Sequence, residues 1–455
     1  MWSLSKPIRV ILVLLGISLF GQLAQAKYGG GSGTAEDPYQ IATAADLLLL
    51  GESPEDYDKH FILTADIDLD PKLPDGKVFD RAVIAPDTDP NDTWGDFQGT
   101  SFTGVFDGNG HTISHLTIQG ENNLGLFGQL ESAAEVRALA LTDVNIVGCG
   151  DRVGALAGTN AGRVTNCSST GMVRAGYDVG GLVGVNGLIV GVHKGVTLYA
   201  AGTMTECFST CVVIGAYSVG GLAGSNPSWM GHIVRCFSTG AVSGTGRSVG
   251  GLVGYNGGPV TDCYSKGSVT GAFGVGGLVG DNSGTYGEVN GEYGLITMCY
   301  SVGSVAGTGS VGGLVGCGPE YEVIDDVIAS FWDTQTSDQA TSAGGTGKTT
   351  AEMQTAGTFL EAGWDFVGQF DNGTEDIWAI CEGVDYPHLA WEFVIGDFDA
   401  DADTDFADFC ILAEHWLAAD GSFWCGQGCD LTNDGSVDFD DLNELARNWL
   451  TGLVP

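Results

Sequence analysis

Residues 249–270 read Val-Gly-Gly-Leu-Val-Gly-Tyr-Asn-Gly-Gly-Pro-Val-Thr-Asp-Cys-Tyr-Ser-Lys-Gly-Ser-Val-Thr and contain the pattern that decides the fold of this chain. The opening Val-Gly-Gly-Leu-Val-Gly recurs, with a few changes to Ala, at starts 153, 179, 219, 249, 275 and 311. Successive starts are separated by 26, 40, 30, 26 and 36 residues. Because the two shortest intervals agree, we infer a repeat of about 26 residues with insertions chiefly at 188–204 and 283–295.

Each repeat is built from short strands that Gly turns separate. In order, it has an apolar-Gly-Gly-Leu-apolar-Gly segment, an Asn, a strand ending in Cys-aromatic-Ser, and a Gly-x-Val segment. One unit is too small to bury an apolar face alone, so successive units must stack as coils and share a core. The sequence therefore predicts a mainly β fold, a parallel β-helix with strands about 4.8 Å apart.

Stacking places equivalent residues above one another and predicts two internal columns. The first is an asparagine ladder, bonded along the stack through its side-chain amides, made of Asn160, Asn186, Asn226, Asn256 and Asn282. The second is a cysteine column, made of Cys167, Cys207, Cys236, Cys263 and Cys299. We expect free thiols in this column, because pairing within it would leave one cysteine out and small apolar side chains suit a core. A metal-thiolate stack would need His ligands or short Cys-x-x-Cys spacing, which these positions lack.

The segments outside the repeats are expected to complete the solenoid. Asn109-Gly110, within residues 102–112, predicts a hairpin turn between two alternating strands at the first coil. Residues 35–70 are expected to cover one end, 330–334 to form the last coil and 350–391 to close the other end, since open ends template aggregation. The predicted divisions are a signal peptide (1–26), an N-terminal cap (27–100), the repeat β-helix (101–335), a C-terminal cap and linker (336–395) and a C-terminal domain (396–455).

The N-terminus and the charge indicate an exported protein. Lys6 and Arg9 precede an apolar run over 10–20 and the small-residue site Ala24-Gln25-Ala26, which predicts a signal peptide cleaved after about Ala26. That run is shorter than the roughly 20 residues that span a membrane, and the mature chain has no second run of spanning length. The formal net charge of −40 would repel a phosphate backbone, which argues against nucleic acid as a partner. We expect a secreted, extracellular or cell-surface protein.

Two acidic segments near the C-terminus align without gaps at an offset of 33 residues. Counted from the first Asp, oxygen donors fall at positions 1, 3, 5, 9 and 12, and position 7 offers its backbone carbonyl; this spacing suits Ca²⁺. The predicted ligands are Asp397, Asp399, Asp401, Asp403, Asp405 and Asp408 in loop one, and Asp430, Thr432, Asp434, Ser436, Asp438 and Asp441 in loop two. At the sharp turn, loop two has Gly435 where loop one has Ala402.

Each loop is followed by a predicted helix with an apolar side, over 409–417 and 442–450, and both helices end in Trp-Leu. An acidic solvated tail is the alternative, but it would need neither the paired loops nor the paired helices. Cys425 and Cys429, with Cys410 nearby, leave room for one disulfide whose pairing stays open.

These two patterns resemble known families. The repeats, over roughly residues 120–318, resemble the GLUG motif of bacterial surface and secreted proteins, which implies a right-handed parallel β-helix outside the cell. The loop-helix pair, over about residues 396–450, resembles a type I dockerin. That resemblance implies a small all-α domain with two EF-hand-type calcium loops and docking to a cohesin-like partner, often in polysaccharide-degrading assemblies. The partner stays open, because Phe406-Ala407 and Phe439-Asp440 stand where that family often has Ser and Thr.

Catalytic signatures are weak in this sequence. Residues 344–350 lack the first Gly of a phosphate-binding loop and are expected to form a turn, and no His-Glu-x-x-His motif occurs. Glycan-cleaving sites need clustered carboxylates, or carboxylates with a basic residue, on one face. The repeats and their boundary offer scattered candidates, namely Asp178, Asp262, Asp281, Arg247 and the pair Asp325-Asp326.

We therefore expect a noncatalytic binding, adhesive or structural protein whose β-helix is displayed through the calcium module. The alternative is a polysaccharide-degrading component of an extracellular complex, with acids supplied by the insertions. The module is expected to dock to a cohesin-like protein or, alternatively, to a surface of its own repeat domain, and an extracellular polysaccharide is a further candidate ligand.

Overall fold

The computed structural model describes residues 27–89, 97–193, 196–227, 231–283, 294–317, 326–367, 373–392, 406–414, 416 and 436–447. The predicted signal peptide lies outside these residues. In the ranges given, no helix is long and apolar enough to cross a membrane.

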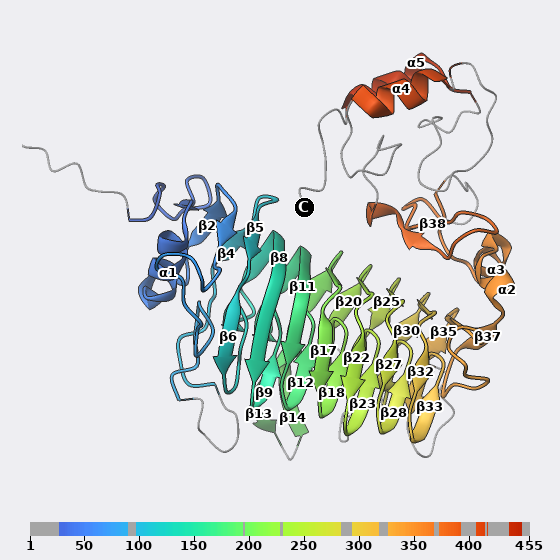
Figure 1. Ribbon diagram of the computed structural model, residues 1–455, viewed down its shortest axis with the longest axis horizontal. Helices are drawn as coiled ribbons and strands as arrows, with labels where there is room; N and C mark the ends of the chain where they lie inside the picture. Colours follow the sequence, from blue (N-terminus) through green and yellow to red (C-terminus); the bar gives the residue numbers. More distant parts are fainter. Residues whose placement is uncertain are drawn as a thin grey trace, which may run out of the picture.

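Strands β1 to β37 wind into a solenoid whose coils lie side by side in chain order (Figure 1). Each repeat coil passes in turn through sheet C, sheet B and sheet A, and neighbouring coils pair in parallel. This confirms a mainly β fold of parallel sheets curled around an axis. The right-handed winding implied by the resemblance stays a prediction.

Sheet C contains β9 (Asp151–Val153), β12 (Tyr177–Gly180), β18 (Tyr217–Gly220), β23 (Arg247–Gly250), β28 (Phe273–Gly276) and β33 (Gly309–Gly312). Sheet B contains β7 (Phe127–Leu130), β10 (Ala157–Asn160), β13 (Val183–His193), β19 (Ala223–Asn226), β24 (Val253–Asn256), β29 (Val279–Asp281) and β34 (Val315–Cys317). Strand β14 (Val196–Ala201) pairs antiparallel with β13, so the insertion predicted at 188–204 includes a hairpin.

Sheet A is the broad side of the solenoid. It opens with β1 (Tyr39–Ile41), β2 (His60–Leu63), β3 (Ile67–Asp68), β4 (Val105–Asp107), β5 (Thr112–Ser114) and β6 (Thr117–Gly120), followed by the long strands β8 (Glu135–Gly148) and β11 (Arg163–Arg174). Later coils contribute three short strands each: β15 (Thr203–Thr205), β16 (Phe208–Ser209) and β17 (Val212–Gly215); β20 (His232–Val234), β21 (Phe237–Ser238) and β22 (Val242–Gly244); β25 (Val260–Thr261), β26 (Tyr264–Ser265) and β27 (Val269–Thr270); β30 (Ile296–Thr297), β31 (Tyr300–Ser301) and β32 (Val305–Ala306). The sheet ends with β35 (Val327–Ile328), β36 (Phe331–Asp333) and β37 (Thr346–Lys348).

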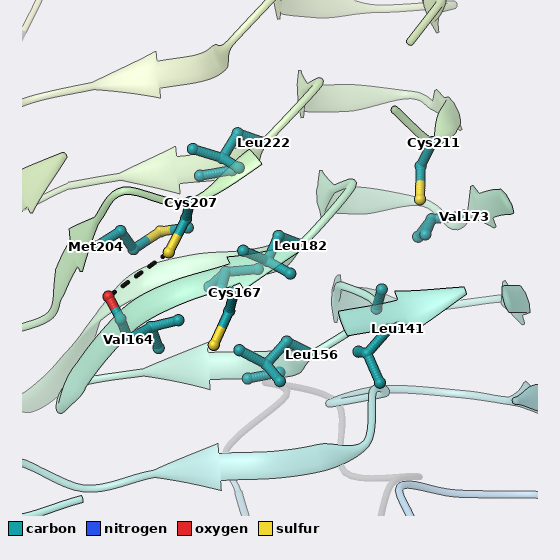
Figure 2. Close-up of a cluster of buried hydrophobic side chains, with 14 of the residues drawn as sticks. Leu141, Leu156, Val164, Cys167, Val173, Leu182, Met204, Cys207, Cys211 and Leu222 are labelled. Atoms are coloured by element: carbon teal, nitrogen blue, oxygen red, sulfur yellow. Dashed lines mark hydrogen bonds between the residues drawn. The ribbon is translucent and has the colours of Figure 1, made fainter. Parts of the chain in front are cut away.

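The repeated apolar residues form one continuous core. Val253 pairs with Ala223 on one side and Val279 on the other, so motif residues stand directly above one another. The motif leucines are fully buried, at Leu156, Leu182, Leu222, Leu252, Leu278 and Leu314. Burying each leucine contributes about 1.5–3 kcal/mol. Figure 2 shows three of these leucines, Leu156, Leu182 and Leu222, pointing into the same interior as Cys167 and Cys207.

The motif positions must be glycine because neighbouring backbone segments lie too close to them to leave room for a side chain. A Cβ at Gly250 would lie 2.0 Å from the carbonyl oxygen of Val253, and one at Gly254 would lie 2.4 Å from the backbone nitrogen of Val219. At these separations no side chain fits, so sheets B and C come together only because the motif supplies Gly at both places.

Both predicted columns are confirmed. In the asparagine ladder, each Nδ2 donates to the next Oδ1: Asn160 to Asn186 at 2.9 Å, Asn186 to Asn226 at 3.0 Å, Asn226 to Asn256 at 3.0 Å and Asn256 to Asn282 at 2.8 Å. The cysteine column is buried and its members are free thiols. Its sulfurs lie against backbone carbonyls, as with Cys207 Sγ and the oxygen of Val164 at 3.6 Å (Figure 2).

The hairpin expected at Asn109-Gly110 is wrong. Both residues have positive φ, 53° and 77°, so the predicted turn is present. However, β4 and β5 both pair in parallel with β8, which makes them successive segments of one coil. The Asn-Gly pair favours a local turn, as predicted. The strands on either side of the turn pair with β8 and not with each other, because both stack on that neighbouring coil.

The ends of the solenoid are covered by loops and one helix. Helix α1 (Ala44–Gly51), capped by Thr43, buries Leu47 and Leu50 in the main core and precedes the 3₁₀ turn Pro54–Asp56. At the other end, the backbone of 334–345 hydrogen-bonds to the last coil, with Val305 N donating to Ser337 O and Gly313 N to Thr341 O. Residues 346–348, expected to be a turn, form β37, and Thr349 caps α2 (Thr350–Met353).

Residues 350–392 do not lie where we expected. We predicted that they close the end of the stack, but they run back along the side of sheet A, as the next section describes. This segment, named the strap, contains α2, α3 (Ala356–Leu360), β38 (Trp378–Ala379), β39 (His388–Leu389) and the 3₁₀ turn Ala390–Glu392.

Candidate functional site

An aromatic ladder lines the outer side of sheet A next to the cysteine column. It consists of Phe208, Phe237, Tyr264, Tyr300 and Phe331, one from each successive coil. Neighbouring rings from Phe208 to Tyr300 stack at centroid distances of 4.8–5.0 Å and interplanar angles of 10° or less. The ladder faces away from the main core, so another surface must cover it if it is to stay out of water.

The strap provides that cover. Phe359 and Trp364 pack on Phe331, Trp378 on Tyr264 and Tyr300, and Trp391 on Phe237. The strap and the ladder form an apolar cluster separate from the main core of the solenoid. The chain therefore doubles back over the coils it has just formed, and residue 392 lies several coils before the C-terminal end of the stack.

Three tryptophans hold the strap by one recurring contact. Trp364 Nε1 donates to Ala329 O at 2.8 Å, Trp391 Nε1 to Arg235 O at 3.1 Å, and Trp378 Nε1 to Asp262 Oδ1 at 3.2 Å. Ala329, Asp262 and Arg235 occupy the same coil corner, with φ between 48° and 51°. This left-handed corner bends the strand and leaves oxygens directed outward for a donor.

A polar cluster, named the His388 junction, fastens the C-terminal part of the strap. Tyr264 Oη donates to Glu392 Oε2 at 2.7 Å, and the same carboxylate lies 3.3 Å from His388 Nδ1. On the other side of the ring, His388 Nε2 lies 3.2 Å from Lys266 Nζ and 3.1 Å from Asp385 Oδ2. The junction thus joins two solenoid side chains to three strap side chains.

Burial sets the protonation of these groups. It raises the pKa of Asp262 to about 6, although the hydrogen bond from Trp378 acts in the opposite direction. Burial alone would lower the pKa of His388, but its hydrogen bond to Glu392 and the nearby carboxylates outweigh that effect and raise it. Burial lowers the pKa of Lys266.

The strap and its ladder were missed at the sequence level. Two signals could have found them. For four of the five column cysteines the next residue is aromatic, at a position that must point away from the core, since strand side chains alternate. Trp364, Trp378 and Trp391 recur at intervals of 14 and 13 residues after the repeats end.

The predicted calcium module is described in part. Helices α4 (Phe406–Glu414) and α5 (Phe439–Arg447) overlap the predicted helices, but each begins three residues earlier than predicted, within the last positions of its loop. Their small core contains Leu412, Val437 and Leu445, and the Trp416 and Phe439 rings meet edge to face at 5.1 Å. Eight predicted ligands lie outside the described residues, namely Asp397, Asp399, Asp401, Asp403, Asp405, Asp430, Thr432 and Asp434.

The end of loop two is held by local hydrogen bonds. Asp441, at position 12, is fully buried, and its Oδ2 accepts a hydrogen bond of 2.7 Å from Asp438 N. Asp438 Oδ1 in turn accepts from Asp440 N at 2.9 Å. These hydrogen bonds close the first turn of α5. Within the described residues no three His, Cys, Asp or Glu side chains gather as a metal site, so calcium at these loops stays a prediction.

The scattered candidate catalytic residues each have a local partner. Asp178 in β12 accepts a hydrogen bond from Ser225, and Asp281 in β29 lies 3.5 Å from Ser248 Oγ. Arg247 stacks over the Phe273 ring at 4.8 Å, while Asp262 lies under Trp378. Asp281 and Arg247 both act on the pKa of Cys317 and so lie near each other, but the structure does not bring all four residues together. Asp325 lies outside the described residues.

The repeat geometry agrees with what comparison with known proteins finds. Residues 245–270 match the GLUG motif. Those residues form β23 to β27, one complete coil. The chain is similar to halomucin of Haloquadratum walsbyi, with 37% identity over 164 residues, and to a protein named as a Gly-rich membrane protein of Evansella cellulosilytica, with 36% identity over 174 residues. These matches cover 35% and 36% of this chain but only 2% and 18% of the relatives.

Two solved structures share features of the backbone. One, named as an immunoglobulin A1 protease from Bacteroides ovatus, has a TM-score of 0.47 and 18% identity, covering 80% of this chain and 96% of that one. Another, named as an IgA1 protease, has a TM-score of 0.41 and 16% identity, covering 64% of this chain and 21% of that one. Neither similarity is high enough to support an inference about this chain.

Proposed function

We propose that this chain is a noncatalytic structural and binding protein of the cell surface or extracellular space. The observation that carries the proposal is that the recurring leucines, asparagines and cysteines of the repeat are interior, and that its recurring aromatics are covered by the strap. The outer positions of sheet C, in contrast, change along the stack, where Tyr177 and Tyr217 are followed by Arg247 and Phe273. Such a solenoid presents an extended surface whose side chains can vary without disturbing its core.

The extracellular location is supported by the N-terminal signal-like segment and by the names of the two relatives. One relative is named halomucin, and the other is named as a Gly-rich membrane protein. The strongly acidic composition disfavours nucleic acid as a ligand. An extracellular polysaccharide remains the ligand class that we would test first.

In this proposal the C-terminal module attaches the solenoid to a partner, so that the solenoid is displayed on that partner. In this proposal the two loops bind Ca²⁺, which joins the acidic loops to α4 and α5 and creates a docking face for a cohesin-like partner. The buried position of Asp441 and the paired helices support it.

Calorimetric titration of Ca²⁺ into the chelator-treated full mature chain tests the display step. We expect two bound ions, with one lost in Asp434→Asn and the other lost in Asp399→Asn. Asp440→Asn, an exposed position outside the predicted ligand set, is the matched control and should retain both. No calcium uptake would remove the display step.

Catalysis is tested separately by incubating the calcium-loaded chain with neutral and uronate-containing polysaccharides. We expect retention on at least one polysaccharide without new reducing ends or unsaturated products. Product formation would overturn the noncatalytic assignment and favour the polysaccharide-degrading alternative.

A further inference from the structure

We propose that the strap is a proton-sensitive latch, which covers the aromatic ladder of sheet A when closed and uncovers it when open. This proposal goes beyond the function proposed above and does not depend on calcium binding. It rests on how the strap is attached.

The attachment has the character of an interface between separate units. Among the described residues, no backbone–backbone hydrogen bond joins the strap to the coils, and the only strand pair of the strap is internal, between β38 and β39. The contacts that cross are ring packing and side-chain hydrogen bonds. The cluster they form is separate from the main core, so the coils can stay folded when the strap leaves.

No covalent bond fixes the strap to the coils. Cys381 of the strap is disulfide-bonded, but the coil cysteines are free thiols: Cys149, Cys167, Cys207, Cys211, Cys236, Cys263, Cys299 and Cys317. The disulfide of Cys381 is therefore compatible with opening.

A buried carboxylate of the last coil holds both parts of the strap. Asp333 is fully buried and accepts hydrogen bonds from Thr350 Oγ1 and Tyr386 Oη, both at 2.7 Å. Thr350 begins the strap and Tyr386 lies near its C-terminal end, so opening must break a contact at each.

The closure of the latch depends on pH because two ionisable side chains, Asp262 and His388, lie in the contact between the strap and the coils. Asp262 is 6% exposed and faces Trp378, Arg235, Glu375 and Asp365. His388 faces Tyr264, Lys266, Asp385 and Glu392. Opening returns each group to water and to its ordinary pKa.

Both groups shift the latch in the same direction. The pKa of Asp262 is about 6 when closed and 3.8 in water, so its contribution to closure is complete below 3.8 and is lost as pH rises to about 6. The pKa of His388 is raised from 6.5, so its contribution is present below 6.5 and is lost as pH rises through the raised value. Lys266, whose pKa is lowered from 10.5, acts at higher pH. The latch is therefore tightest in mild acid and loosens toward neutral pH.

Hydrogen–deuterium exchange of the full mature chain tests the latch, with rates corrected for the intrinsic effect of pH. Between pH 4.5 and 7.5 we expect the opening equilibrium of peptides within 373–392 to rise by roughly ten- to a hundredfold, since each pKa unit corresponds to tenfold. Peptides covering 249–270 should stay protected throughout and report that the coils remain folded.

Two conservative variants assign the effect. Asp262→Asn keeps an oxygen for Trp378 but cannot titrate, and should flatten the dependence below pH 6. His388→Gln keeps a polar side chain and should flatten it above pH 6. Asp338→Asn, an exposed acid outside the interface, is the matched control and should behave as the parent.

Strap peptides that exchange only together with 249–270 at both pH values would overturn the latch, because the strap would then be part of the same cooperative unit. A pH dependence that survives unchanged in the Asp262→Asn, His388→Gln double variant would overturn its proton sensitivity. Both exchange results can be interpreted even if the chain binds no calcium, because the peptides measured do not include the predicted calcium loops.

Discussion

Replacing Asn226 by Ala should destabilise the solenoid more than any single exposed substitution, because one interior side chain supports three hydrogen bonds. Asn226 accepts from Asn186 Nδ2 at 3.0 Å and donates to Asn256 Oδ1 at 3.0 Å and to Gly231 O at 3.3 Å. At about 1 kcal/mol for each neutral hydrogen bond, the loss in free energy of unfolding is about 3 kcal/mol. Neither ladder neighbour is left wholly unpaired, since Asn186 Nδ2 still reaches Gly202 O at 3.1 Å and Asn256 Oδ1 still accepts from Gly258 N at 3.4 Å. The loss should therefore not greatly exceed that value.

Urea unfolding of the full mature chain by far-UV circular dichroism measures the change, with hydrogen exchange locating it. Exchange should accelerate first in the coils on either side of Asn226, because repeat coils depend on their immediate neighbours. Asn145→Ala, at an exposed position, is the matched control and should change stability by no more than about 0.5 kcal/mol.

A double substitution separates the ladder bond from general packing. Asn226→Ala and Asn256→Ala both remove the bond between these residues, so the double variant should lose about 1 kcal/mol less than the sum of the single variants. A loss below about 1 kcal/mol for Asn226→Ala, or strict additivity in the cycle, would refute the reasoning.

Four further outcomes are expected. Iodoacetamide should modify the exposed Cys149 and Cys410 in the native chain. Burial raises the pKa values of Cys207, Cys236 and Cys263 well above the ordinary range, so these thiols should react only in denaturant. Labelling of these three cysteines in the native chain, read by mass spectrometry, would contradict this prediction. Gly250→Ala should cost about 3 kcal/mol or more in thermal unfolding, because its Cβ would meet Val253 O at 2.0 Å, whereas Gly357→Ala in α3, with its nearest atom at 3.9 Å, should be neutral or stabilising. Trp378→Phe should weaken strap closure by about 1–3 kcal/mol, because buried Asp262 loses its indole donor, and hydrogen exchange should show the change in the strap but not at 153–184. Chelation of calcium should lower the helical circular dichroism signal of α4 and α5 while the coils keep their protection, and an unchanged helical signal would contradict the calcium proposal.

The sequence-level prediction succeeded where structure repeats. Asn186, Asn226 and Asn256 recur at one position of the motif, and stacking adjacent coils is enough to bring them into contact. The free state of Cys207 and Cys236 follows from the same argument, because a column of identical residues in a packed interior has no reason to pair. The helices after the two acidic loops were also found, since local apolar spacing determines them. Most of the loop residues themselves, among them Asp397 and Asp430, lie outside the described part of the chain, and their calcium role remains a prediction.

The Asn109-Gly110 hairpin failed for a physical reason that applies to any solenoid. A turn of that kind reverses the chain in a hairpin or bends it at a coil corner, and the dihedral angles of the two residues do not distinguish the cases. The free energy of pairing both flanking strands with β8 decides between them. The site was missed for a related reason, because the Cys-aromatic-Ser pattern was recognised as part of the repeat, whereas the segment that covers its aromatics lies outside the repeat.

The sequence by itself determined the coil: its length, its Gly-lined contacts, its leucine core and its two interior columns, because each depends on residues that recur at a fixed interval and touch only the next copy. Only the tertiary structure decided that residues 350–392 fold back along the aromatic ladder. Trp378 meets Asp262 and Trp391 meets Arg235 across more than a hundred residues, and no period relates a unique segment to a repeated one. Which coil corner each indole occupies is set by the direction in which the chain leaves the last coil and by the burial gained along the whole ladder, and these are properties of the assembled fold.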